Sequence, residues 1–332
     1  MTRLRHVGRD ALTIERRPMG RGYAYFDADG RRVKSRELRQ RAHELAIPPA
    51  WTDVWIAADP LAHIQAVGVD AAGRAQYIYH PEWETRRTRR KQKNLSALVA
   101  ALPALRRRVR RDLDAAAGEK ALALAIGVAL IDRTAMRLGR ERYLHAHGTR
   151  GAGTLFTRDV TVARGEVRLS FPSKGGRTSS YVIDDPKLAE AIARIKTIPG
   201  KRLLMVMNGD GRPRPLRTDE INAYLKEIAG APVSAKDFRT LHASALAAEA
   251  LAQLEPGGSE TSRRRQLAGA VKRVAAFLQN TPAICRKSYV APCLFELFDK
   301  DGLRALWTCE TEGARGLRQR EVRLGAVLAV AR

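Results

Sequence analysis

The stretch from Asn280 to Pro292, NTPAICRKSYVAP, contains a tyrosine whose surroundings could make its hydroxyl reactive. Thr281-Pro282 is typical of a helix start, because a threonine hydroxyl caps the first turn and proline fits the first helical position. The pattern predicts a short helix that carries Tyr289 two turns in, just after two basic residues, and that Pro292 limits or kinks. A tyrosine on a short basic helix is a candidate nucleophile.

A tyrosine that attacks a phosphodiester needs cations and a proton donor near it. The cations favour the phenolate and neutralise charge on the phosphate oxygens, and arginine suits this task because its planar fork pairs with two oxygens at once. Arg137 lies late in an otherwise apolar predicted helix, with Arg133 one turn earlier on the same face. Arg239 lies in the first turns of another helix, whose other face is small and apolar, and Lys174 lies in a turn with two glycines.

Each of these residues also has an ordinary structural explanation. An arginine on a helix is more often a surface residue or an ion-pair partner than a catalyst. A lysine in a turn is usually only solvated, and a tyrosine near a proline is usually half-buried packing. The residues therefore gain weight as an ordered set rather than singly.

The elements that position them fall into two parts. Residues 1 to about 85 predict a small, mostly antiparallel β domain, with one helix over Ser35–Leu45. The segments YAYFDADGRRV and HIQAVGVDAAGRAQYIYH each predict two strands around an Asp-x-x-Gly turn. The charge run ETRRTRRKQKN at 84–94 predicts a linker and hinge. The expected domains are therefore residues 1–85 and 86–332.

The second part is mainly helical with a three-stranded β element. Long helices are predicted over Leu95–Leu113 and Glu119–Arg140. Period-two alternation from Thr154 to Phe171 predicts two strands, and RTSSYVID predicts a third. Ser234 with Asp237 three residues later matches a capping box. Further helices are expected at about 184–195, 218–229, 235–254, 261–279 and from about 318.

Composition indicates a polyanionic partner. The chain carries 60 basic against 35 acidic residues, a net charge of +25, and nucleic acid is the leading candidate for its partner. No signal peptide and no apolar run long enough for a membrane is visible. An odd set of three cysteines, Cys285, Cys293 and Cys309, without a CxxC pair, predicts reduced thiols in a cytosolic protein. Neither metal-ligand spacing nor a phosphate-binding glycine loop is present, so we expect no metal or nucleotide cofactor.

The ordered set of arginine, lysine, arginine, a polar residue and tyrosine resembles the poxvirus-like and bacterial type IB DNA topoisomerases. The words KDFRT and NTPAICRKSY are the most specific, and MRLGRERYL, GAGTLFTRDVTV and PPAWTDVWI also match. The resemblance runs from about residue 20 to 300. It implies the catalytic fold shared by tyrosine recombinases and type IB topoisomerases, so that the whole chain is of the α+β class.

The resemblance implies a role for each matched position. Tyr289 corresponds to the nucleophile that forms a 3′-phosphotyrosine bond and frees a 5′-hydroxyl. Arg137 and Arg239 correspond to the pair that clamps the scissile phosphate, Lys174 to the acid that protonates the leaving 5′-oxygen, and Asn280 to a further phosphate contact. Matches to DNA-contacting positions are Gln76, Tyr77, Tyr79, Arg140, Arg142 and Tyr143.

Two positions depart from the family pattern. Many relatives have histidine where Asn280 stands, and asparagine donates a hydrogen bond without carrying charge. The lysine turn commonly has a glycine before the lysine, where this chain has Ser173 after Pro172.

The resemblance further implies ATP- and metal-independent relaxation of supercoiled duplex DNA by a monomer that closes on the duplex as a clamp. We expect a cytoplasmic, nucleoid-associated enzyme. One alternative is a tyrosine recombinase, but that family usually has histidine three residues before the second arginine, where this chain has Lys236. The other alternative is a non-catalytic basic DNA-binding protein, which explains the charge but not the ordered set.

Overall fold

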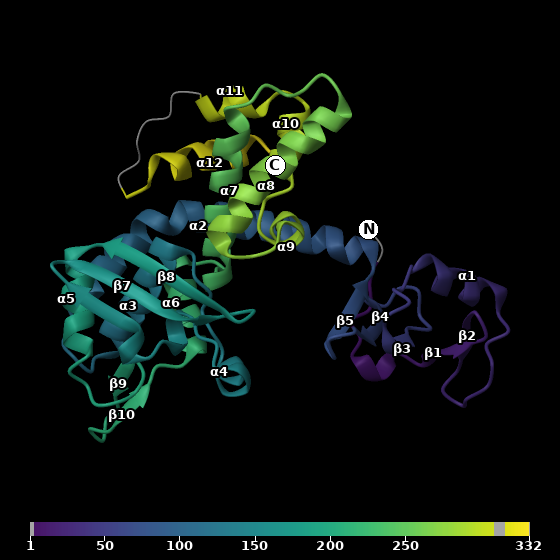
Figure 1. Cartoon of the computed structure of the whole chain (residues 1–332), viewed down its shortest axis with the longest axis horizontal. Coiled ribbons are helices and arrows are strands. Elements are labelled where there is room, and N and C mark those ends of the chain that lie inside the picture. The colour runs from purple at the N-terminus through teal and green to yellow at the C-terminus, as the bar shows by residue number, and fades with distance from the viewer. Residues whose placement is uncertain (1–2, 309–315, 332) are drawn as a thin grey trace. The chain divides into compact units, whose positions relative to one another are not determined.

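The computed structural model of the chain describes residues 3–308 and 316–331 (Figure 1). The chain divides into two compact units, Met1–Arg90 and Lys91–Arg332. The first unit contains a five-stranded antiparallel sheet, and the second is mainly helical with a three-stranded sheet, which confirms the predicted fold class. Among the described residues, no helix is both long and apolar enough to cross a membrane.

The N-terminal unit is built on a sheet with the strand order β2-β1-β3-β4-β5. Its strands are β1 (Ile14–Met19), β2 (Gly22–Phe26), β3 (Thr52–Ile56), β4 (Ile64–Val69) and β5 (Ala75–Tyr79), preceded by a 3-10 turn, η1 (Arg9–Ala11). The hairpin predicted around Asp70 is confirmed as β4 and β5. Helix α1 (Arg36–Glu44) is also confirmed, and the Ser35 hydroxyl accepts the Leu38 N–H at its start.

The first predicted hairpin is only half right. β2 forms its ladder with β1, an upstream strand that the sequence pattern did not single out. Beyond the predicted turn, the chain makes only an isolated bridge between Phe26 and Arg32. The Asp27 carboxylate accepts the backbone N–H groups of Asp29 and Arg31, and the Asp27 N–H donates to the Arg31 carbonyl, so the turn closes without a regular second strand.

The segment expected to be a linker is helical. Helix α2 (Pro81–Asp112) runs through the whole charge run 84–94, and the division between the two units falls inside it. Arginine, lysine, glutamate and glutamine are all good helix formers. Ion pairs one turn apart, such as Arg87 with Glu84, add support. The hinge itself stays a prediction.

The second unit contains most of the helices. Helices α6, α7, α8 and α12 lie close to the predicted ranges, and α9 is shorter than expected because Tyr289 caps its end. Three short helices, α4, α10 and α11, were not predicted. The helices are α3 (Lys120–Thr134), α4 (Glu141–His147), α5 (Pro186–Ile195), α6 (Thr218–Ala229), α7 (Ala235–Ala252), α8 (Glu260–Leu278), α9 (Pro282–Ser288), α10 (Cys293–Asp299), α11 (Leu303–Thr308) and α12 (Gln319–Val330), with the 3-10 turns η2 (Ala152–Thr154) and η3 (Thr157–Asp159).

Helix α3 ends earlier than predicted, which changes the setting of Arg137. Ala135 adopts a left-handed φ of 53°, and the helix stops at Thr134. The Thr134 hydroxyl donates to the Leu130 carbonyl at 2.6 Å and accepts the Met136 N–H at 3.1 Å, so the side chain closes the helix end. Arg137 therefore lies in the irregular segment after the helix, not on its surface as predicted.

The predicted three-stranded element is confirmed as an antiparallel sheet in the order β6-β7-β8. Its strands are β6 (Val160–Ala163), β7 (Glu166–Ser173) and β8 (Arg177–Asp184), and a separate small hairpin, β9 (Met205–Met207) with β10 (Pro213–Pro215), was not predicted. Figure 1 shows the sheet beside α3 and α5, and α5 contacts both β6 and β7. The turn between β7 and β8, at residues 174–176, lies at one end of this sheet.

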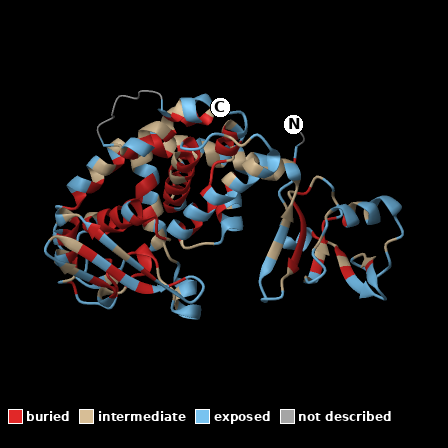
Figure 2. Ribbon diagram, turned by 45° about the horizontal axis from the view of Figure 1, so that its top comes forward, coloured by how far each residue is buried: buried red, intermediate tan, exposed pale blue. Residues whose placement is uncertain are grey.

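Helix α7 lies at the centre of the second unit (Figure 2). It contacts α3, α6, α8, α10, α11 and α12, and it is buried on nearly every side rather than on one apolar face. Its many alanines allow this close packing, and the predicted capping box at its start is confirmed by hydrogen bonds from Ser234 to the Asp237 carboxylate. Its buried polar residues are Asp237, Arg239, Thr240, His242 and Ser244. Each buried polar group needs a hydrogen-bond partner, so these side chains tie α7 to the neighbouring segments.

Candidate active site

Arg239 is a buried cation that lies against the ring of Tyr289. Its side chain is only 3% exposed, and its guanidinium carbon lies 4.9 Å from the centroid of the Tyr289 ring. Nη1 donates to the Ala135 carbonyl at 2.5 Å and Nη2 to the Leu278 carbonyl at 3.0 Å. Nε has no hydrogen-bond partner, and no carboxylate pairs with this guanidinium among the described residues. A buried charge held only by neutral carbonyls can still attract an anion.

Arg137 lies beside Arg239. Burial lowers the pKa of Arg137, and the nearby positive charge of Arg239 lowers it further, whereas the Tyr289 hydroxyl acts in the opposite direction. Within the described residues no carboxylate pairs with either guanidinium, although buried arginines ordinarily have such a counter-charge. The predicted pair is therefore brought together around the predicted tyrosine.

The backbone of Arg137 is held by the segment that follows α4. The Ala152 N–H donates to the Arg137 carbonyl at 2.9 Å, and the Gly153 N–H donates to the Leu138 carbonyl at 2.7 Å. A Cβ atom at Gly151 would lie 2.2 Å from the Arg137 carbonyl oxygen, so only glycine fits there. The word GAGTLFT thus supplies the close approach that fixes Arg137.

Tyr289 is held through its backbone by a buried hydroxyl that the sequence did not reveal. The Ser244 hydroxyl, on the same helix as Arg239, is fully buried. It donates to the Tyr289 carbonyl at 3.3 Å and accepts the Ala291 N–H at 3.1 Å. Helix α7 therefore carries Arg239 and, through Ser244, also holds the backbone at Tyr289.

A lysine on α2 makes a further contact with this segment. The Lys91 ammonium donates to the Val290 carbonyl at 3.4 Å. Burial lowers the pKa of Lys91 to about 8, the positive charge of Lys236 lowers it too, and Asp237 raises it. In the sequence Lys91 is one residue of a charge run, so nothing in its neighbours indicates this contact.

Asn280 lies in the turn that joins α8 to α9. Its N–H donates to the Ala275 carbonyl at 3.0 Å and its Oδ1 accepts the Thr281 N–H at 3.1 Å. No hydrogen bond from its Nδ2 is made to the described part of the chain, so this amide keeps free donors. The preceding residue, Gln279, accepts a hydrogen bond from the Ser179 hydroxyl of β8, which ties this turn to the β7–β8 hairpin.

Lys174 stands apart from the other predicted residues. It is exposed at the tip of the β7–β8 hairpin, before Gly175 and Gly176, which have φ values of 85° and 71°. The structure records no contact between Lys174 and Tyr289 within the described residues. The Ser173 hydroxyl donates to the Arg177 carbonyl at 3.1 Å, so the serine that departs from the family pattern closes the hairpin below the lysine.

Tyr181 is a second phenol at this site, and sequence reasoning missed it. It lies on β8, half-buried, with its ring stacked near Phe171 at a centroid distance of 6.2 Å. Burial raises the pKa of Tyr181, whereas a hydrogen bond with Ser179 and the charges of Arg239 and Arg137 act to lower it. Its position in an alternating strand gave no signal of its proximity to the arginines.

The described thiols are free and buried. Cys285 lies one turn before Tyr289, and burial raises its pKa although Arg239 and Arg137 act to lower it. Burial likewise raises the pKa of Cys293 to about 11. Cys309 lies outside the described residues. These thiols are therefore protonated packing groups at neutral pH.

Three of the predicted DNA-contacting residues lie on β5, the edge strand of the N-terminal sheet. Tyr77 and Tyr79 are two residues apart on one face, with ring centroids 6.0 Å apart, and Tyr77 is 43% exposed. Arg87 lies over the Tyr79 ring at 5.2 Å. Gln76 differs, because its amide nitrogen already donates to the Asp70 carboxylate at 2.8 Å. The strand presents an aromatic and basic surface.

The other predicted DNA-contacting residues lie at the start of α4. Arg140 precedes the helix and is exposed, and Arg142 donates to the Tyr143 hydroxyl at 2.9 Å. The Arg142 guanidinium also lies 4.6 Å from the centre of the Tyr143 ring, which is 45% exposed. Stacked aromatic and arginine groups of this kind can contact phosphates and sugars.

Comparison with known proteins adds the family context. A family model described as the catalytic core of eukaryotic DNA topoisomerase I matches residues 80–293, and one described as the N-terminal domain of bacterial DNA topoisomerase IB matches residues 22–70. The DNA topoisomerase 1B of Acanthamoeba polyphaga mimivirus is 29% identical over 286 residues, which cover 84% of each chain. The catalytic-core match spans Arg137, Lys174, Arg239, Asn280 and Tyr289.

Proposed function

Because the chain belongs to the type IB DNA topoisomerase family, we propose that it relaxes supercoiled duplex DNA by cutting and rejoining one strand through Tyr289. The Tyr289 hydroxyl loses its proton to solvent as its oxygen attacks the scissile phosphorus, the bond from phosphorus to the 5′-oxygen breaks, and a 3′-phosphotyrosine bond forms. The cut strand rotates, and the freed 5′-hydroxyl then attacks the same phosphorus and releases the tyrosine.

The observation that carries this proposal is the pair of guanidiniums at the tyrosine, neither of which pairs with a carboxylate in the described part of the chain. Arg239 is buried against the Tyr289 ring with only carbonyl partners, and Arg137 lies close enough for the two charges to repel. A phosphodiester carries one negative charge and gains more as the tyrosine attacks. Preorganised cations aimed at that point stabilise the transition state more than the ground state.

The remaining residues complete the reaction. Lys174 gives its proton to the 5′-oxygen as it leaves, and a free Asn280 amide donates to a non-bridging oxygen. One phosphodiester is exchanged for another, so bond energy is conserved and ATP is not required. The arginines provide the charge neutralisation that metal ions supply at other phosphoryl-transfer sites.

Duplex DNA is the proposed partner, with supercoiling as the driving force for relaxation. The basic and aromatic surfaces at β5 and at the start of α4 are proposed to contact its backbone and grooves. We further propose that a single chain acts as a clamp on the duplex, in the cytoplasm with the nucleoid.

Tyr289→Phe tests the proposal against a matched neighbour. It removes one hydroxyl and no charge, so plasmid relaxation and the covalent protein–DNA adduct should vanish while DNA affinity stays unchanged. Tyr181→Phe removes the other phenol near the same arginines and should still form the adduct. Relaxation is assayed with EDTA and without ATP, and the adduct is trapped by denaturation. Relaxation by Tyr289→Phe, or an adduct lost only in Tyr181→Phe, would refute Tyr289 as the nucleophile.

A further inference from the structure

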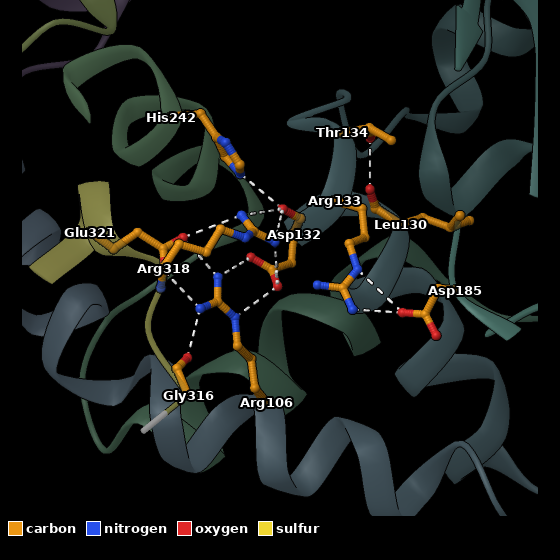
Figure 3. A network of polar contacts seen from close by, with 10 residues as sticks. All are labelled: Arg106, Leu130, Asp132, Arg133, Thr134, Asp185, His242, Gly316, Arg318 and Glu321. Atoms are coloured by element: carbon orange, nitrogen blue, oxygen red, sulfur yellow. Dashed lines mark hydrogen bonds and ion pairs between the residues drawn. The ribbon is translucent and has the colours of Figure 1, made fainter. Parts of the chain in front are cut away.

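A buried ion cluster joins the C-terminal helix α12 to α2 and to α3, the helix that ends just before Arg137 (Figure 3). The cluster consists of Arg106 on α2, Asp132 on α3, and Arg318 and Glu321 at the start of α12. The side chains of Asp132 and Glu321 are 7% and 2% exposed. Two carboxylates balance two guanidiniums, so the cluster is neutral as a whole.

Arg106 is the hub of the cluster. Its Nε and Nη2 donate to the Asp132 carboxylate at 2.9 and 2.8 Å, and Nη1 and Nη2 donate to the Glu321 carboxylate at 2.7 and 2.8 Å. Nη1 also donates to the Gly316 carbonyl at 2.7 Å. Every N–H donor of the guanidinium is used in a fixed fork geometry. The cluster therefore sets the position of α12 against α2 and α3.

Glu321 is ionised in the cluster because of its arginine neighbours. Burial alone would raise the pKa of Glu321, but the hydrogen bond and charge of Arg106 outweigh it and lower that pKa. The same balance lowers the pKa of Asp132. Removal of either carboxylate leaves two guanidiniums with a single counter-charge, and this excess positive charge in a largely buried cluster is destabilising.

The cluster reaches the site through Asp132. This residue is in the last turn of α3, and Ala135, which follows that turn, gives its carbonyl to Arg239. The Asp132 carbonyl also lies 2.9 Å from the His242 Nε2 on α7, one turn after Arg239. Arg318 lies 3.4 Å from the same carbonyl. One short segment of backbone is thus contacted by α12, by α7 and by Arg239.

We propose that α12 is part of the catalytic framework and that Glu321, through Arg106 and Asp132, is a positioning residue for the Arg137 and Arg239 pair. Helix α12 lies beyond the segment matched by the catalytic-core family, which ends at residue 293. A shift of α12 moves the end of α3, and with it both the carbonyl that holds Arg239 and the segment that carries Arg137. The inference rests on the proposed cleavage by Tyr289.

The test compares two isosteric changes in buried ion clusters. Glu321→Gln removes the charge that α12 brings to Arg106. Asp112→Asn is the matched control, because the Asp112 carboxylate on α2 is also buried and accepts from Arg108 and Tyr224, and it makes no recorded contact with Arg239 in the described part of the chain. Both changes should lower the thermal stability. Only Glu321→Gln should slow single-turnover cleavage, by about tenfold to a hundredfold at saturating enzyme, as a displacement of up to about 1 Å would. DNA affinity should stay unchanged in both.

A double-mutant comparison separates positioning from general destabilisation. Glu321→Gln and Arg239→Lys act through the same guanidinium position, so their combined loss of cleavage rate should be smaller than the product of the single losses. Should Glu321→Gln fail to fold, Arg318→Gln changes a more exposed member of the cluster and should slow cleavage relative to the wild-type chain, and cleavage at the wild-type rate would overturn the positioning role.

The outcomes are distinct. Cleavage by Glu321→Gln at the wild-type rate, equal slowing in Asp112→Asn, or independent losses in the double mutant would each overturn the positioning role. If the wild-type chain forms no covalent adduct in the same assay, the proposed function fails instead. The positioning role is supported if only Glu321→Gln slows cleavage, if DNA affinity is unchanged, and if the rate losses in the double mutant are not independent.

Discussion

Lys174 is the proposed catalytic side chain with the fewest constraints. It projects from a glycine turn, exposed, whereas Arg239 is buried and bonded to two carbonyls. This contrast suits different tasks. A group that binds the non-bridging oxygens must be fixed before the substrate arrives, but a proton donor can be brought to the 5′-oxygen when DNA orders the hairpin.

Lys174→Ala should therefore be rescued by a change in the leaving group. On ordinary DNA we expect cleavage to slow by about 10²–10⁴-fold, the usual contribution of a general acid. A substrate with sulfur in place of the bridging 5′-oxygen should restore much of the rate, because a thiolate leaves without a proton. The measurement is single-turnover cleavage of both substrates.

Arg239→Ala is the control for this experiment. Its proposed task is to stabilise charge on the non-bridging oxygens, so sulfur at the bridging position should help it much less. Equal rescue of both variants, or of neither, would return Lys174 to a simple phosphate contact.

The sequence identified side chains with specific neighbours and missed those that act through backbone. Tyr289 and Arg239 stand in distinctive words, and the structure brings them into contact. Ser244 and Lys91 each bind a carbonyl next to the tyrosine, an interaction that any polar residue at the right distance could make. Such contacts depend on tertiary packing, which no local pattern encodes.

At the scale of elements, helix ends matter more than helix bodies. The sequence predicted the body of α3 well but extended it through Arg137, because the apolar pattern continues there. The actual end depends on the Thr134 side chain and on the left-handed Ala135, two features that periodicity does not detect. The early end frees the Ala135 carbonyl to hold Arg239.

Gly151 is the point where this irregular segment is most tightly packed. Gly151→Ala would place a methyl group 2.2 Å from the Arg137 carbonyl oxygen, a backbone atom that cannot rotate away. The segment must shift, so we expect cleavage to fall by up to about 10²-fold. Overpacking should also cost about 1–3 kcal/mol of stability. Single-turnover cleavage and thermal unfolding measure the two effects.

Gly209→Ala is the matched control, because a Cβ at Gly209 meets no atom within 4 Å. It should cleave DNA at the wild-type rate. Normal cleavage by Gly151→Ala would mean that the segment adjusts elsewhere and that the glycine does not fix Arg137.

At the scale of the whole molecule, the count of 60 basic residues overstates the number of cations available for DNA. Several arginines are committed to internal carboxylates, among them Arg106 with Asp132, Arg150 with Asp159 and Arg214 with Glu220. Others, such as Arg142, contact an exposed tyrosine in the same helix and pair with no carboxylate among the described residues. The sequence predicted a polyanionic partner but could not separate these two groups, because pairing is a tertiary property.

The salt dependence of DNA binding should distinguish arginines that contact DNA from arginines that are paired within the protein. Each phosphate neutralised by the protein contributes about −0.9 to the slope of log K against log salt. Arg142→Gln should therefore make the slope shallower by about 0.9. Arg304→Gln is the control, because it removes the same charge from α11, at the other end of the second unit from α4 (Figure 1). Arg304 pairs with Glu255 at 3.0 Å, so its loss should leave the slope unchanged. Both changes are made in a Tyr289→Phe background, so that binding is measured without cleavage. Because the two variants have equal net charge, equal slopes would show that binding follows total charge rather than the proposed contacts at α4.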